Sequence, residues 1–364
     1  MINLAPKKLD LYIVKKFMGT FFVALIFMIG IVIIFDISEK IDNFVAKEAP
    51  LKAIIFDYYM NFIPYFMNMF SSLFVFLTVI FFTSKMAQNS EIIAILSGGV
   101  SFHRLMVPYM FSAAVICVLS LVLNLYVIPT ANETRLRFEN QYVKTRSNLA
   151  TRDVHYQIGP STFVYVESFS TWNNTAYKFS LEEIKDNKLV SKLEAETAVW
   201  DSTLGGWNLK KYFIRDYTDE LEDHIKSGKQ MDTVIALTID DFYMNKLTVQ
   251  RLPEKQLNQL IKTQEMRGDS NIIYAQIEKH TRWSMPFSVF ILTIIGVSLS
   301  SKKKRGGIGW NLAIGIALSF SYILFQRFSQ MFVITGAMPP GIAIWTPNML
   351  YAIIAVFIYR WAPK

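Results

Sequence analysis

Long apolar runs alternate with polar segments along the chain, and this pattern predicts helices that cross a membrane. A helix rises about 1.5 Å per residue, so roughly 20 apolar residues span the roughly 30 Å of hydrocarbon in a bilayer. Six runs come near this length: Val14–Phe35, Tyr58–Phe82, Leu105–Ile128, Trp283–Leu299, Trp310–Ile334 and Ile342–Trp361. The first is too long for the apolar part of a signal peptide, and no small-residue cleavage site follows it. We therefore expect it to remain as an anchor.

A polar segment of about 150 residues separates the third run from the fourth, and its pattern is typical of strands. Apolar and polar residues alternate in short runs between Val154 and Ser170, and the pairs Asp186-Asn187 and Gly205-Gly206 supply turns. Near the second turn, apolar residues recur close to every second position: Trp207, Leu209, Tyr212 and Ile214. The segment is expected to form an antiparallel sandwich or an open barrel.

Helical patterns flank these strands. Glu133–Asn148 extends the third span, and Pro253–Arg267 forms a polar amphipathic helix that leads back to the membrane. The predicted fold class is an α+β membrane protein, with six transmembrane helices split three and three by an inserted antiparallel β domain. Its expected parts are residues 1–148 with three spans, 149–252 with the β domain, 253–279 with the connecting helix, and 280–364 with three spans.

Composition and charge agree with a multi-pass membrane protein. Hydrophobic residues make up 52% and charged residues 18%, which is too little charge for a soluble globule. The polar segments 1–16, 85–104, 302–305 and 360–364 hold twelve basic residues against Asp10 and Glu91. The insert between Asn132 and His280 carries 22 acidic against 20 basic residues. By the positive-inside rule, both termini and the loop 85–104 are cytoplasmic and the insert is exported.

The net charge of +8 is therefore a signal of topology, and no nucleic-acid partner is expected. The chain's one cysteine, Cys117, lies in an apolar run, so no disulfide within the chain is possible. Three asparagines in the apolar runs, Asn61, Asn68 and Asn124, are expected to bridge helices.

Motifs of catalysis are missing from the sequence. Its four histidines have no metal-ligand spacing, and neither a GxSxG motif nor a phosphate-binding GxxxxGK[ST] loop occurs. The glycine-rich run Gly306–Gly309 leads from a basic loop into an apolar span and does not follow a strand. The spans also lack paired carboxylates, which disfavours a proton-coupled carrier. We therefore expect neither an enzyme, nor a metal site, nor a cofactor held by this chain.

The cytoplasmic loop between Lys85 and Arg104 predicts a short helix at the membrane surface. Asn89 or Ser90 is suited to cap its start, Glu91 suits the positive helix end, and Gly98-Gly99 suits its stop. Such a helix could merely connect two spans, or it could dock a cytoplasmic partner. Glu91 favours docking, because an acid gains little from an anionic lipid surface. The candidate docking residues are Ser90, Glu91, Ile92, Ile95, Leu96, Gly98 and Gly99.

Three cations are candidates for contact with an anionic substrate. Lys40 and Lys47 follow the outer end of the first span, and Arg327 lies about two-thirds of the way along the fifth. Cations at this level suit phosphate groups, with which they form charge-assisted hydrogen bonds. The alternative is that they extend to the membrane interface without a substrate role.

Three stretches resemble the LptF/LptG lipopolysaccharide export permeases. They are NSEIIAILSGGVSFHRLMVP (Asn89–Pro108), SKKKRGGIGWNLAIGIALSFSYILFQRFSQ (Ser301–Gln330) and PPGIAIWTPNMLYAII (Pro339–Ile354). The insert is similar in its pattern AETAVWD…GWNLKKYFI, and FDISEKIDNF (Phe35–Phe44) is more similar to LptG than to LptF. The layout of three spans, an exported β domain and three spans extends the resemblance over nearly the whole chain.

The resemblance implies a permease subunit of an ABC transporter in the bacterial inner membrane. Implied partners are a second permease of the LptF/LptG type, an LptB-like ATPase dimer that binds ATP, LptC-like and LptA-like jellyroll proteins, and lipopolysaccharide. It also implies that the exported domain is a β-jellyroll with an apolar interior. The docking role then falls on the helix at about 89–100, with Glu91 as the pairing residue, and Lys40 and Arg327 are candidates for contact with lipid phosphates.

A function of another class fits the same layout. The chain could be a mechanotransmitting or sensing membrane protein whose exported β domain binds a protein partner. In that case the β domain would have no interior large enough for a lipid. A secondary carrier is a weaker third option, because the spans lack paired ionisable groups.

Overall fold

The computed structural model describes residues 8–143, 150–217, 224–242, 246–269, 271–302 and 307–362. The chain forms two compact units. The helical unit comprises Met1–Tyr142 with Gln276–Lys364, and the sheet unit comprises Val143–Ala275.

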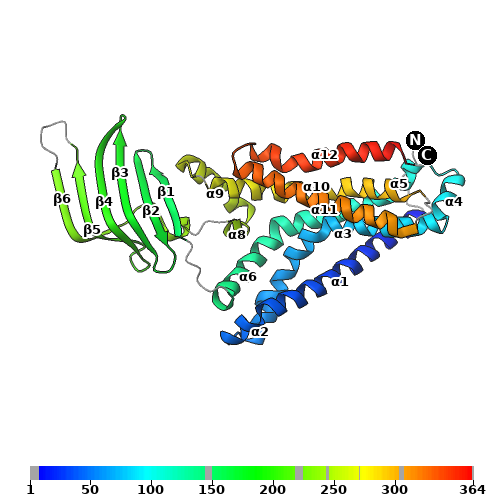
Figure 1. Cartoon of the computed structure of the whole chain (residues 1–364), viewed down its shortest axis with the longest axis horizontal. Coiled ribbons are helices and arrows are strands. Elements are labelled where there is room, and N and C mark those ends of the chain that lie inside the picture. The colour runs from blue at the N-terminus through cyan, green and yellow to red at the C-terminus, as the bar shows by residue number, and fades with distance from the viewer. Residues whose placement is uncertain are drawn as a thin grey trace. The chain divides into compact units, whose positions relative to one another are not determined.

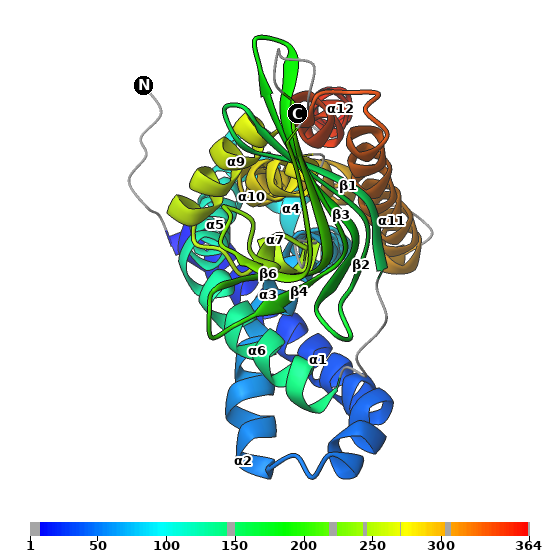
Figure 2. The ribbon, with the colours of Figure 1, turned by 90° about the vertical axis from the view of Figure 1, so that its left-hand side faces the viewer.

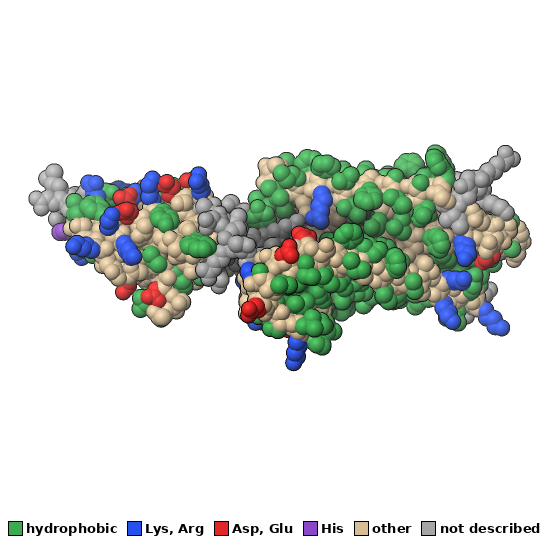
Figure 3. Space-filling view, turned by 60° about the horizontal axis from the view of Figure 1, so that its bottom comes forward, with side chains coloured by type: hydrophobic (Ala, Val, Ile, Leu, Met, Phe, Trp, Pro, Cys, Tyr) green, Lys and Arg blue, Asp and Glu red, His purple; other side chains and the backbone are tan. Residues whose placement is uncertain are grey.

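Among the described residues, six helices of the helical unit are long and apolar enough to cross a membrane, as the sequence predicted. Its described elements are α1 (Lys8–Ala46), α2 (Leu51–Ala53), the π-helical η1 (Ile54–Tyr59), α3 (Met60–Gln88), α4 (Glu91–Ser97), α5 (Phe102–Val122), the π-helical η2 (Leu123–Val127), α6 (Ile128–Tyr142), α10 (Ile272–Ser300), α11 (Gly307–Ile334) and α12 (Pro340–Arg360) (Figure 1). Hydrophobic side chains cover most of this unit's visible surface in Figure 3, as expected for a surface that faces lipid.

Two spans extend further than their apolar runs. The first span was predicted to end at Phe35, but α1 continues to Ala46 through acidic and basic residues. Asp36 and Lys40 are one helical turn apart and form an ion pair at 2.6 Å, which supports the polar extension. The third span likewise continues without a break from Phe102 to Tyr142, so the extension predicted over Glu133–Asn148 is confirmed as far as Tyr142, and residues 144–148 lie outside the described residues.

Helix α3 is the centre of the helical unit and packs against α1, α6 and α11. Small residues allow close approach: a Cβ added at Gly296 of α10 would lie 2.9 Å from Val79 Cγ1 of α3. Polar side chains also join the helices, since Asn68 Nδ2 donates to Asn124 Oδ1 at 2.7 Å. The prediction for these two asparagines is confirmed. It was wrong for Asn61, which donates to carbonyl oxygens of its own helical segment.

The sheet unit is built on one antiparallel sheet with its six strands in chain order, which confirms the predicted α+β class. The strands are β1 (Ala150–Gly159), β2 (Thr162–Ser170), β3 (Thr175–Lys185), β4 (Lys188–Asp201), β5 (Gly206–Asp216) and β6 (His224–Thr233). The described strands therefore form an open meander and not two packed sheets. Figure 2 shows the sheet curved around α7 (Ile239–Phe242). The helices α8 (Lys246–Val249) and α9 (Glu254–Arg267) follow, and α9 corresponds to the predicted amphipathic helix.

A row of left-handed residues crosses the sheet and accounts for part of its curvature. Asp153, Lys178 and Lys211 lie at one level in alternate strands, with φ values of 53°, 49° and 51°. Alternation of side chains shifts by one residue at this row, so Val166 and Phe169 of β2 are both fully buried although three residues apart. Bulge-like backbone of this kind bends strands and increases their twist.

Replacing Gly296 tests the close packing of α10 against α3. We expect Gly296→Val to destabilise the detergent-solubilised chain by about 1–3 kcal/mol, because the added atoms overlap Val79 and Phe76. Gly30→Val is the matched control, since a Cβ at Gly30 meets nothing within 4 Å. Thermal unfolding followed by circular dichroism measures both variants, and equal midpoints would contradict the packing described.

Candidate coupling helix and lipid-contact residues

The short helix α4 has the length and the stop that the sequence predicted. Its C-terminus is a Schellman motif, in which the Gly99 amide donates to Leu96 O at 3.0 Å and the Val100 amide to Ile95 O at 3.3 Å. Gly99 takes the left-handed conformation that this motif requires, with φ of 83°. The start differs from expectation: Ser90 precedes α4 with φ of 62°, and its side chain makes no capping hydrogen bond.

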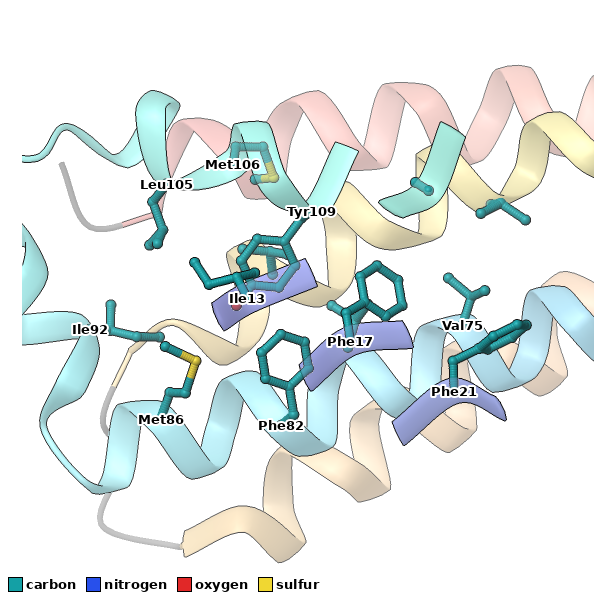
Figure 4. Packing of buried hydrophobic residues seen from close by; sticks show 14 of the residues in the cluster. Ile13, Phe17, Phe21, Val75, Phe82, Met86, Ile92, Leu105, Met106 and Tyr109 are labelled. Atoms are coloured by element: carbon teal, nitrogen blue, oxygen red, sulfur yellow. The ribbon is translucent and has the colours of Figure 1, made fainter. Parts of the chain in front are cut away.

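One face of α4 is buried in the core of its own chain. Ile92 is fully buried and points toward Met86 and the first turns of α1 (Figure 4). Ile95 and Leu96 pack more loosely against the same core. These three candidate residues therefore anchor α4, and a docking partner could reach Ile92 only if α4 moved.

The opposite face of α4 is exposed and includes a residue that the sequence analysis missed. Ile93 is 48% exposed, and Ala94, Ser97 and Gly98 beside it are also exposed. The spacing of the buried positions Ile92, Ile95 and Leu96 would have pointed to this face, because residues three and four apart share one side of a helix. An exposed isoleucine beside small residues can enter a shallow groove of a partner.

The carboxylate of Glu91 is positioned by two neighbours. Tyr12 Oη of α1 donates to Glu91 Oε2 at 3.2 Å, and Asn89 Nδ2 donates to Glu91 Oε1 at 3.1 Å. The side chain remains half-exposed at the positive end of α4. Glu91 can therefore still accept a hydrogen bond from a cation outside the chain.

A bidentate ion pair fixes the other end of the loop to the same helix. Arg104 Nη1 and Nη2 donate to the two carboxylate oxygens of Asp10 at 2.7 and 2.5 Å. Ser101 Oγ accepts from the Arg104 amide at 3.3 Å and caps α5. Two polar ties, one at each end of the loop, thus join it to the first turns of α1.

The segments predicted to be cytoplasmic gather at one end of the helical unit. Besides the ties to α1, the ring of Phe102 lies 5.7 Å from the ring of Tyr359 near the end of α12. Asn311 Nδ2 near the start of α11 donates to Ser84 Oγ at 3.0 Å. Figure 1 shows α4 at this end. The basic loop residues 303–305 lie outside the described residues.

Lys40 lies in a polar and aromatic cluster near the other end of α1. Its ammonium donates to Asp36 and to the hydroxyl of Tyr58, and it lies 4.9 Å from the centre of the Tyr58 ring. Tyr59 Oη also donates to Asp36, at 3.2 Å. The Lys40 side chain is 17% exposed, so contact with an external anion requires it to exchange Asp36 for that anion.

The other two candidate cations are more accessible. Lys47 follows the last residue of α1 and is exposed. Arg327 is exposed on α11 beside the equally exposed Leu324 and Phe328, and has no hydrogen bond or ion pair with any residue that the structure describes. The structure therefore does not bring the three candidate cations together within one chain.

Sequence analysis missed a fourth cation at this level. Arg135 of α6 is only 5% exposed, lies 4.9 Å from the Tyr65 ring, and pairs with Glu139 at 3.6 Å. Its Nε has no hydrogen-bond partner among the described residues. The helical pattern from Glu133 onward marked this segment as an extension of a span and gave no sign that Arg135 would turn inward.

The sheet unit holds a groove of about 890 Å³. Its lining combines the rings of Phe163, Phe179 and Phe213 with the ammonium groups of Lys178, Lys192 and Lys211. Ion pairing to Glu167 raises the pKa of Lys178 above its ordinary value. The lining also includes Glu182, Glu194 and Glu196, and ion pairs to glutamates hold Lys192 and Lys211. The groove therefore combines aromatic rings with paired charges of both signs, which suits an amphiphile that can exchange for one partner of an ion pair.

The apolar interior of the sheet is partly filled by the chain itself. Trp207 Nε1 donates to Leu237 O at 2.8 Å, and the Phe242 ring of α7 stacks on Phe169 at 4.2 Å. The expected apolar interior is present, but its residues are buried by packing within the unit.

A family model described as the lipopolysaccharide export system permease LptF/LptG matches residues 11–361. The chain belongs to this family. The match includes both halves of the helical unit and the whole sheet unit, and it gives the chain the general role of a permease in lipopolysaccharide export. The description covers LptF and LptG together, so greater similarity to LptG stays a prediction. No curated protein matches the chain.

Exchanging the charges of the bidentate pair tests whether it holds the loop. Arg104→Asp should raise amide hydrogen exchange in residues 98–104, because two like charges then face each other. The double variant Asp10→Arg with Arg104→Asp restores opposite charges and should recover much of the protection. Amide hydrogen exchange measured by mass spectrometry compares the single variant with the double variant. Equal exchange in the single variant and the parent would show that the pair does not constrain the loop.

Proposed function

We propose that the chain is the transmembrane permease subunit of an ABC transporter that extracts lipopolysaccharide from the inner membrane. It then passes the lipid to a periplasmic bridge for assembly into the outer membrane. Family membership supports the substrate class. The observation that carries the proposal further is α4, whose one face is anchored in its own chain while the other face is exposed at the membrane surface.

Energy for extraction comes from a partner ATPase dimer of the LptB type. The sequence has no GxxxxGK[ST] nucleotide-binding loop, so this chain is not expected to hydrolyse ATP. In the proposal, the exposed face of α4 sits in a groove of the ATPase and Glu91 pairs with a cation there. Tyr12 and Asn89 restrict the carboxylate before docking, which lowers the entropic cost of forming the pair.

A second permease of the same family completes the transport cavity. Helices α1 and α11 are the least buried spans of the isolated chain. In the apolar 18-residue stretch of each span, 17% and 22% of the residues are buried in α1 and α11. The corresponding shares are 56% and 61% for the spans that contain α3 and α10. Arg327 lies on α11, and a charge that faces hydrocarbon is costly. A cavity enclosed by α1 and α11 of two permeases would instead place Arg327 and Lys40 near lipid phosphates.

The ties within the chain suggest how ATPase motion reaches the cavity. When two docked ATPases close on ATP, the two α4 helices are drawn together. Each α1 follows its α4, because Tyr12–Glu91 and Asp10–Arg104 join the loop to the first turns of α1. The cavity narrows, the energy of the bound lipid rises, and the lipid leaves toward the sheet unit. LptC-like and LptA-like jellyroll proteins then receive it.

Reversing the charge at Glu91 tests the docking. We expect Glu91→Lys to abolish stimulated ATP turnover in the reconstituted complex while the chain still inserts into the membrane. Glu91→Gln is the matched variant: it keeps a side-chain oxygen that can accept from Tyr12 but loses the charge, so it should retain partial turnover. Full activity of Glu91→Lys would remove Glu91 from the mechanism.

Photo-crosslinking from the sheet unit distinguishes transport from a sensing function. A photoreactive residue at Phe163, which lines the groove, should form adducts with lipopolysaccharide in cells with active ATPase. A probe at exposed Trp172, which is not among the groove's lining residues, is the control. Adducts with protein alone at Phe163 would favour the sensing function over transport.

A further inference from the structure

A second groove lies in the helical unit, between α5, α10 and α12, and has no role in the mechanism above. Its volume is about 830 Å³, within the range typical of small-molecule sites. The walls are almost entirely apolar and include Met110, Phe111, Ile291, Ile294, Ala352 and Val356. The groove follows α5 and α12 for about 12 Å, since its lining residues span eight positions on each helix.

Two basic side chains, a histidine and an arginine, stand at one end of this groove. His103 is the second residue of α5, Arg360 is the last residue of α12, and both are exposed lining residues. Neither has a hydrogen bond or an ion pair with any residue in the described ranges. Their neighbour Arg104, by contrast, is paired with Asp10. Among the described residues, no carboxylate pairs with either side chain at the mouth of the groove.

We propose that this groove binds an anionic phospholipid, with an acyl chain along its apolar walls and the phosphate between His103 and Arg360. Basic pockets between transmembrane helices at the membrane surface are suited to anionic headgroups. The cations stand at helix ends, where a headgroup lies, and the apolar walls begin one turn further into the span. That the lipid comes from the cytoplasmic leaflet rests on the orientation given under the proposed function.

A second copy of the chain fits the groove less well. A symmetric contact would bring two cationic mouths together, whereas an anionic headgroup complements them. The groove is also distinct from the proposed transport cavity, because its lining residues lie on α5, α10 and α12 and include none from α1 or α11.

Occupancy of this groove would bear on the coupling helix. Phe102, the first residue of α5, precedes His103 and contacts Tyr359, which itself lines the groove. A lipid that holds α5 and α12 together at this point restrains the segment that follows the Gly98-Gly99 stop. The membrane's content of anionic lipid would then influence how firmly the docking surface is held.

Native mass spectrometry of the full chain in detergent tests the site directly. Phosphatidylglycerol and phosphatidylcholine with identical acyl chains are added at equal concentration. The parent chain should bind phosphatidylglycerol more tightly than phosphatidylcholine. The double variant His103→Ala with Arg360→Ala should lose this preference, and loss of the arginine charge alone should reduce the ratio of the two affinities about fivefold or more. Arg360→Lys should keep it. Lys302→Ala, which removes an exposed cation outside the groove, is the matched control and should leave the preference unchanged.

Filling the groove tests the acyl-chain half of the proposal. Ala352→Phe adds volume to the wall without altering charge, so it should weaken binding of both lipids and preserve the preference between them. Unchanged selectivity in the double variant, or unchanged affinity in Ala352→Phe, would overturn the proposal. So would displacement of the lipid by glycerol phosphate at equal concentration, because the headgroup alone would then be the ligand. Since no ATPase or lipopolysaccharide is present, these outcomes are independent of transport.

Discussion

A polar group inside hydrocarbon must find a partner, and this constraint shapes the helical unit. Asn68 and Asn124 satisfy each other between helices, and Lys40, just beyond the apolar run of α1, is paired with Asp36 one turn away. Because these polar side chains are paired within the chain, a charged side chain on a span without such a partner stands out. Arg327 has no partner within the described chain, although it lies on a span and is exposed. A charge on an exposed face of a span is costly in lipid, which is why Arg327 remains a candidate for contact with an anion.

Helix α1 connects two of the places where the chain carries candidate functional charges. It is 39 residues long without an internal proline, so it spans about 58 Å as one element. Its first turns hold the loop of α4 through Asp10 and Tyr12, and its last turns hold Lys40. Between these ends it is only lightly buried. Its buried side chains from Ile13 to Leu25 lie on one face, which packs in the core of the helical unit, and the rest of the span is exposed.

The sequence predicted the membrane spans well because hydropathy is a direct consequence of the bilayer. It was less informative where charged residues continue a helix, so the end of α1 was placed at Phe35 and not at Ala46. The docking residues show a similar limit. The stretch was identified from Glu91 and the glycine pair, but which apolar residues face inward depends on packing against α1. Ile92 is consequently an anchor, and the exposed Ile93 was overlooked.

The sequence indicated one of the two polar partners of Lys40 and not the other. Asp36 stands four residues before Lys40, so their ion pair was predictable from helical spacing. The contact of Lys40 with Tyr58 was not, because it depends on how α1 meets a π-helical turn that no local pattern revealed. The sheet gave a clearer signal. Trp207 and Leu209 are two positions apart, as are Tyr212 and Ile214, but Tyr212 is three positions after Leu209. The longer interval contains the left-handed residue Lys211.

The row through Asp153, Lys178 and Lys211 has a mechanical consequence for the sheet. Strand pairing is interrupted at this row and continues in register on both sides of it. Charged pairs such as Lys211 with Glu196 lie along it in contact with water, so they can rearrange cheaply. Deformation of the sheet is therefore expected to be concentrated along this row of residues. Bending along this row would change the curvature of the sheet while the strand segments on both sides of it keep their hydrogen bonds.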